Sequence, residues 1–113
     1  MTLQQSIIEQ LASNAIRVGA DVLNIEYKSG YEEVFAMCGN IGHGIASLKS
    51  TSPGAESLRA ELQAMVRRNR QFTLADREYE LRCRVYESFG EDAYRVKIVP
   101  VNVKSPRSER VSR

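Results

Sequence analysis

The 113-residue sequence has few of the residues from which catalytic and metal sites are built. His43 is its single histidine, and Cys38 and Cys83 are its two cysteines. Histidine catalysis needs a nearby nucleophile and an orienting group, and zinc sites need several ligands at short spacings. His43 lies between two glycines without such neighbours. We therefore expect no enzyme activity, no metal and no cofactor, with His43 in an exposed loop.

Long apolar runs and an export signal are also missing. No apolar run approaches the roughly 20 residues that span a bilayer, so we expect no membrane insertion. Residues 1–5 show no basic region followed by an apolar one, as a secretory signal would. The sequence therefore predicts a cytoplasmic protein, without a disulfide and with Cys38 and Cys83 as small buried apolar residues.

Positive charge is concentrated at one end of the chain. Residues 101–113 contain four of the 16 Lys and Arg residues but one of the 14 Asp and Glu residues. Residues 1–100 are left with 12 basic against 13 acidic residues, which is close to neutral. We expect one domain over residues 1–100 and a disordered basic tail over residues 101–113.

Apolar spacings of three and four predict two amphipathic helices. The first extends from about Thr2 to Val18, with Thr2 as N-cap and Gly19 at its end. The second extends from Pro53 to about Asn69, with Ser52 as N-cap. The predicted buried residues are, in the first helix, Leu3, Ile7, Leu11, Ala15 and Val18, and in the second, Ala55, Leu58, Leu62, Met65 and Val66.

Extended segments occur in two pairs. Residues 21–28 and 32–38 flank a turn at 28–31 in which Gly30 fits a hairpin. Residues 79–85 and 94–99 alternate apolar and charged side chains, which predicts a second hairpin with one buried face. The glycine-rich residues 39–44 lack the Gly-Lys-Ser/Thr ending of a phosphate-binding loop and are interpreted as a flexible connection.

The predicted order is therefore αββαββ. Such an order predicts an α+β fold with a mainly antiparallel four-stranded sheet and both helices on one face. The acidic pairs Glu32-Glu33 and Glu91-Asp92 lie beside or within predicted turns, where side chains are usually solvated. The cluster Arg67–Arg70 is interpreted as favourable charge at the end of the second helix.

The second hairpin also suggests a binding surface. If Val85 faces Tyr94, then Arg84 lies opposite Arg95 and Arg82 lies opposite Lys97. Like charges directly across a strand pair cost roughly 0.2–1 kcal/mol. One interpretation is that the diagonal residues Glu80 and Glu87 offset this cost. The other is that Arg82, Arg84, Arg95 and Lys97 bind an acidic partner through the outer face of the sheet.

Two segments resemble the N-terminal domain of the type II secretion and type IV pilus ATPases. Residues 15–26, A-I-R-V-G-A-D-V-L-N-I-E, are similar to that family's A-I-R-L-G-A-S-D-I-H-I-E. Residues 77–84, R-E-Y-E-L-R-C-R, resemble its G-R-E-x-D-L-R-V-S strand, and Gly90-Glu91 resembles the G-E before its closing strand. The resemblance covers roughly residues 5–99, and it implies a PAS-like αββαββ domain that docks on neighbouring subunits.

The sequence departs from that family at several positions. The family's serine, aspartate and histidine are replaced by Asp21, Val22 and Asn24, and Glu33 and Phe35 stand where its second strand carries arginines. The R-x-P-Q-D-G segment and a Walker motif are missing from the 113 residues. The resemblance therefore implies a stand-alone accessory domain without a motor.

Three functions follow from these observations. The first is a non-catalytic protein-interaction or regulatory module whose partner is a secretion or pilus ATPase, or a second copy of the chain. The second is nucleic-acid binding through the tail and the Arg67–Arg70 cluster, which the near-neutral body disfavours. The third is a PAS-like small-molecule sensor, for which the sequence offers no dedicated anchor.

Overall fold

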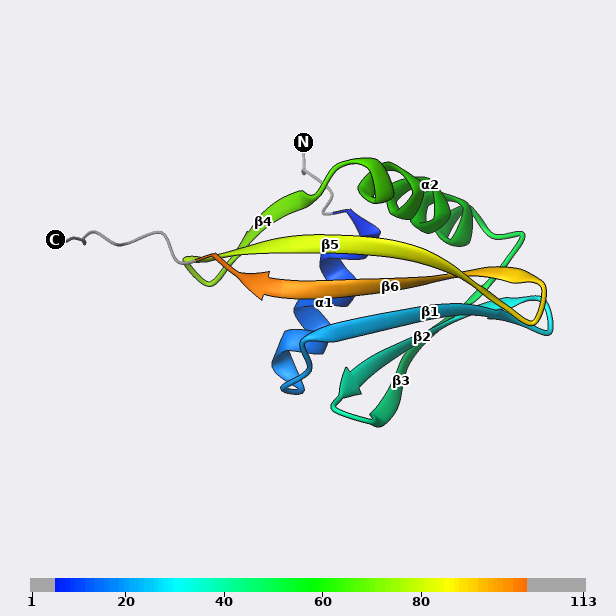
Figure 1. Ribbon diagram of the computed structural model, residues 1–113, viewed down its shortest axis with the longest axis horizontal. Coiled ribbons are helices and arrows are strands. Elements are labelled where there is room, and N and C mark those ends of the chain that lie inside the picture. The colour runs from blue at the N-terminus through cyan, green and yellow to red at the C-terminus, as the bar shows by residue number, and fades with distance from the viewer. Residues whose placement is uncertain (1–5, 102–113) are drawn as a thin grey trace, which may run out of the picture.

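The computed structural model describes residues 6–101, which form one antiparallel sheet with two helices on one of its faces (Figure 1). The elements are α1 (Ile7–Arg17), β1 (Val22–Lys28), β2 (Tyr31–Cys38), β3 (Ile41–Lys49), α2 (Pro53–Arg67), β4 (Arg70–Leu74), β5 (Arg77–Ser88) and β6 (Glu91–Pro100). The predicted tail, apart from Val101, lies outside the described residues.

The predicted four-stranded αββαββ arrangement, which the resemblance described as PAS-like, is wrong. The sheet has six strands in the order β3-β2-β1-β6-β5-β4, and the order along the chain is αβββαβββ. Each half of the chain forms a helix followed by a three-stranded meander. The two meanders join through antiparallel pairing of β1 with β6, from Val22↔Lys97 to Ile25↔Tyr94.

The first missed strand, β3, replaces the predicted flexible connection. Gly39 has φ +63° and forms the turn with Asn40, so β3 starts at Ile41 and pairs with β2. Gly42 and Gly44 lie under β2 side chains, since a Cβ on Gly42 would approach Met37 Sδ to 3.0 Å. The ring of Phe35 covers Gly44 in the same way. His43 is exposed as expected, but it lies within a strand.

The second missed strand, β4, begins directly after α2. The helix ends at Arg67, two residues before its predicted end, and Arg68 is already extended with φ −153° and ψ 121°. Phe72 anchors β4 by stacking on Tyr79 of β5, with ring centroids 5.5 Å apart. β4 has five residues and one buried side chain. Its alternation is therefore too short to indicate a strand from the sequence.

The helix ends follow ordinary capping chemistry. Ser6 caps α1 by accepting a hydrogen bond from the Glu9 amide at 3.1 Å, whereas the predicted cap Thr2 lies outside the described residues. Gly19 follows the helix with φ +83°, as predicted. Ser52 accepts from the Ala55 amide at 3.2 Å, with Pro53 in the first turn of α2. This confirms the predicted start of α2.

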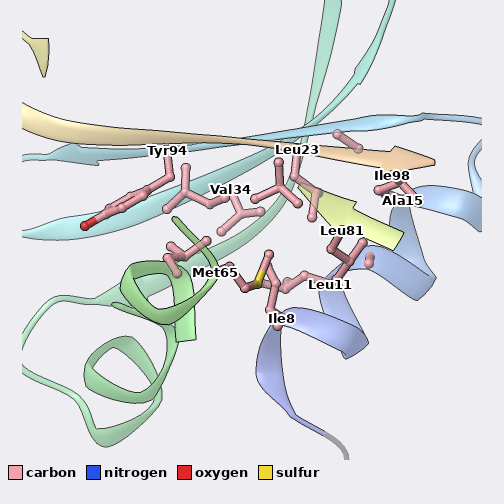
Figure 2. Packing of buried hydrophobic residues seen from close by; sticks show 14 of the residues in the cluster. Ile8, Leu11, Ala15, Leu23, Val34, Met65, Leu81, Tyr94 and Ile98 are labelled. Atoms are coloured by element: carbon pink, nitrogen blue, oxygen red, sulfur yellow. The ribbon is translucent and has the colours of Figure 1, made fainter. Parts of the chain in front are cut away.

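The core lies between the helices and one face of the sheet (Figure 2). Its largest fully buried side chains come from both helices and from β1, β2, β5 and β6: Ile8, Leu58, Leu62, Leu23, Ile25, Val34, Leu81 and Val96. The predicted members Val18 and Val66 are instead exposed. Among the described residues, no helix combines the length and the apolar character needed to cross a bilayer.

The expected solvation of the acidic pairs is wrong for Glu32, and the pair Glu91-Asp92 lies in a strand rather than in a turn. Glu91 and Asp92 are the first residues of β6, because the turn is formed by Phe89 and Gly90. Glu32 lies on the helix-facing side of β2 and is buried. Its Oε2 atom accepts hydrogen bonds from Ser50 Oγ at 2.8 Å and from Arg59 Nη1 at 3.1 Å. Glu32 is therefore a buried structural ion-pair residue and not a solvated one.

Candidate docking surface

The second hairpin has the predicted register, which defines a cationic patch formed by Arg82, Arg84, Arg95 and Lys97. Arg82 pairs with Lys97 and Arg84 pairs with Arg95 across β5 and β6. All four residues are exposed. Their neighbours along each strand point to the core, so the four side chains project from the outer face of the sheet.

Most of the positive charge in the cationic patch is unpaired. Arg82 bonds Glu80 on its own strand, with Arg82 Nη2 3.0 Å from Glu80 Oε1. Within residues 6–101, no carboxylate lies within 4 Å of Arg84, Arg95 or Lys97. Glu87, predicted to offset the repulsion, lies opposite Asp92 and alternates onto the helix-facing side. In the described part of the chain, an ion pair thus offsets the repulsion only at Arg82.

The outer face is hollowed where the cationic patch meets β1. A depression of about 470 Å³ is lined by Val22 of β1 together with Cys83 and the four cations. Asn24 follows Val22 on this face and lies opposite Arg95. The side-chain oxygen of Asn24 is buried without a hydrogen-bond partner in the described structure. An incoming hydrogen-bond donor would satisfy it.

Acidic residues border the cationic patch on one side. Glu26 of β1 and Glu33 of β2 lie opposite each other on the outer face. Tyr86 of β5 donates a hydrogen bond to Glu26 Oε2 at 3.5 Å. Burial, and then the charge and hydrogen bond of Glu26, raise the pKa of Tyr86, whereas Arg95 lowers it. The outer face therefore carries positive charge at the cationic patch on β5 and β6 and negative charge over part of β1 and β2.

Apolar side chains complete the outer face beside these charges. Val22, Phe35 and Met37 are half-buried, and pairing of β1 with β2 places them on the outer face because Leu23 and Val34 point to the core. Sequence reasoning missed them because β2 is apolar on both faces. Only the register of β2 with β1 shows which residues of β2 face the core and which face the surface.

The predicted basic cluster Arg67–Arg70 is divided by the fold. Arg67 and Arg68 are exposed at the end of α2. Arg70 belongs to β4 and its Nε atom lies 2.8 Å from Glu9 Oε2 of α1. The cluster is therefore not one continuous basic surface.

In the described part of the chain, no group of three His, Cys, Asp or Glu side chains could hold a metal ion.

Both cysteines are free and half-buried rather than fully buried. Burial raises the pKa of the Cys83 thiol to about 11. A rise of two units lowers the thiolate fraction at a given pH below the pKa by about a hundredfold, and the thiolate is the reactive form. Cys83 is therefore not a candidate nucleophile near neutral pH.

We expect Cys83 to react slowly with iodoacetamide in the folded protein. In a Cys38→Ser variant, which leaves Cys83 as the only thiol, alkylation at pH 8 should be about a hundredfold slower in the native state than in urea. Mass spectrometry of quenched samples measures both rates. Equal rates in the two states would contradict the buried position of this thiol.

Comparison with known proteins gives no assignment. No protein-family model matches the chain, and no curated protein is significantly similar to it.

Proposed function

We propose that the chain is a non-catalytic protein-interaction module that binds an acidic surface of a partner protein through the outer face of its sheet. The observation that carries this proposal is the cationic patch, in which Arg84, Arg95 and Lys97 have no carboxylate within 4 Å among the described residues. Both helices pack on the opposite face, and no described element covers this one (Figure 1).

The neighbouring side chains suit a protein partner. Val22, Phe35 and Met37 offer apolar contact area beside the cations, and arginine and aromatic residues are enriched in protein interfaces. Arg84 and Arg95 each present a planar group that can bind a carboxylate through two hydrogen bonds. The acidic pair Glu26 and Glu33 on the same face disfavours a nucleic-acid backbone.

The resemblance to secretion and pilus ATPases suggests a candidate partner. Residues 15–26 include the end of α1 and the start of β1, and residues 77–84 form the first part of β5. Of these residues, those in β1 and β5 belong to the sheet whose outer face carries the cationic patch. A secretion or pilus ATPase is the first partner to test, and cytoplasmic location stays a prediction from the sequence.

Charge reversal of the central cation pair tests this proposal. The double variant Arg84→Glu/Arg95→Glu should lose the partner that the wild-type chain captures from a nuclease-treated extract of its host. The loss should exceed tenfold, because a close charge pair at an interface contributes more than about 1.4 kcal/mol. Quantitative mass spectrometry of the captured proteins measures it.

Arg17→Glu/Arg77→Glu is the matched control, since it changes the net charge equally at exposed sites outside the cationic patch. This control should retain the partner. Undiminished capture by Arg84→Glu/Arg95→Glu would contradict the proposed surface. Capture that disappears on nuclease treatment in the wild type would instead favour nucleic acid.

A further inference from the structure

One edge of β5 is left open by the shortness of β4. The two strands pair from Leu74↔Arg77 to Arg70↔Leu81, so among residues 6–101 the segment 82–88 of β5 pairs only with β6. Beside this open edge, on the helix-facing side, lies a depression of about 290 Å³. It is lined by Gln63, Val66, Arg67, Val85, Asp92 and Tyr94.

Two apolar residues of this depression are exposed although their spacing assigns them to the core. Val66 continues the buried stripe of α2, and Val85 continues the inward alternation of β5. They are 41% and 40% exposed, respectively. The apolar character of these two exposed positions is explained if the surface of another molecule covers the depression.

Phe89 is a third exposed apolar residue, which lies outside the depression at the tip of the same hairpin. Its side chain is fully exposed, and its φ of 53° with Gly90 at 80° defines a turn in the left-handed region. Asn, Asp and Gly are preferred in such turns, and a bulky residue there is strained. A residue that is unfavourable both in exposure and in backbone conformation is a candidate for a functional contact.

Charges around the depression are complementary to one another but unpaired. Glu87 and Asp92 lie directly opposite each other on the hairpin, which is unfavourable for like charges. Arg67 and Arg68 are exposed at the end of α2. In the part of the chain that the structure describes, none of these four side chains has an oppositely charged group within 4 Å.

We infer that this region binds a second copy of the chain. In a dimer with two-fold symmetry the same patch must contain both partners of every contact. Here the region around the open edge of β5 contains an exposed apolar side chain, Phe89, and an apolar depression that includes Val85. The two residues are four positions, or about 13 Å, apart along the strand. This region also holds both signs of charge.

Two hairpins lying antiparallel along their open edges would therefore form each contact twice. Phe89 of each copy would enter the depression of the other, where it covers Val66 and Val85. Arg67 of each copy would reach Glu87 of the other. This dimer leaves the cationic patch open, so it does not depend on the function proposed above.

Phe89→Asn separates dimerisation from folding. It creates Asn-Gly, the preferred sequence for this turn, so the monomer should be at least as stable as the wild type. We expect the wild type to dimerise in sedimentation velocity, and this variant to dimerise at least tenfold more weakly. Ile41→Asn should leave the dimer unchanged, because it replaces an exposed apolar residue of β3, a strand that β2 and β1 separate from this hairpin (Figure 1).

The charges allow a second test. Arg67→Glu and Glu87→Arg should each weaken the dimer, because each variant alone brings two like-charge pairs together. Mixing the two variants should restore a dimer, since each copy then meets an opposite charge. A wild type that stays monomeric, a dimer insensitive to Phe89→Asn, or a mixture that forms no heterodimer would overturn the inference.

Discussion

Replacing Arg59 with alanine should lower the free energy of unfolding by about 2–4 kcal/mol, because it leaves the Glu32 carboxylate buried without its cation. The side chain of Glu32 is 8% exposed, and Ser50 Oγ is its other bonded partner in the described structure. Arg59 also donates from Nη2 to the Ser50 carbonyl at 3.1 Å, so the variant loses two contacts. Urea denaturation followed by circular dichroism measures the change.

The matched control is Arg82→Ala, which removes an ion pair of nearly equal length. Arg82 lies 3.0 Å from Glu80 but is 53% exposed, and exposed pairs contribute about 0–1 kcal/mol. The double variant Glu32→Leu/Arg59→Met should recover most of the lost stability, since an apolar pair can replace a buried ion pair. Equal losses in Arg59→Ala and Arg82→Ala would show that burial of Glu32 does not decide the effect.

Leu62→Ala should destabilise the protein by about 2–5 kcal/mol, the range for removing a large buried side chain. Leu62 is fully buried under the sheet. Val66, one turn later on α2, is 41% exposed. Val66→Ala should therefore cost less than about 1 kcal/mol in dilute solution.

Denaturation of both variants at low protein concentration tests this contrast. Only Val66→Ala should become more costly as the concentration rises, because the proposed dimer covers Val66 and mass action then stabilises the wild type. An equally large loss for both variants at low concentration would contradict the described position of Val66.

The sequence predicted the parts of the fold in which local pattern and packing agree. The β5–β6 register was predicted residue by residue because apolar side chains alternate with charged ones over the whole hairpin. The start of α2 and the end of α1 followed from Ser52-Pro53 and Gly19. The cationic patch could be located for the same reason, since its four residues are the charged members of that alternation.

The two missed strands lack such a local pattern. In β3, Gly42 and Gly44 have no side chains, and the side chains of Met37 and Phe35 of β2 cover these positions. The register between the two strands also shifts between Val34 and Phe35. In β4, Phe72 is the one buried residue. Both strands are determined by neighbouring strands, so single-sequence periodicity could not indicate them. The exposure of Val66 follows from the same cause, because β4 is too short to cover it.

The joining of the two meanders has a consequence for folding. Within each meander the strands are neighbours along the chain and can pair early, but β1 meets β6 across some seventy residues, as in Val22↔Lys97. Contacts of such long sequence separation form slowly. On the ribosome, the central pairing of β1 with β6 cannot form until β6, the last strand, has emerged. Until then β1 has an unpaired edge, which is the point at which chaperone binding or misassembly between nascent chains would begin.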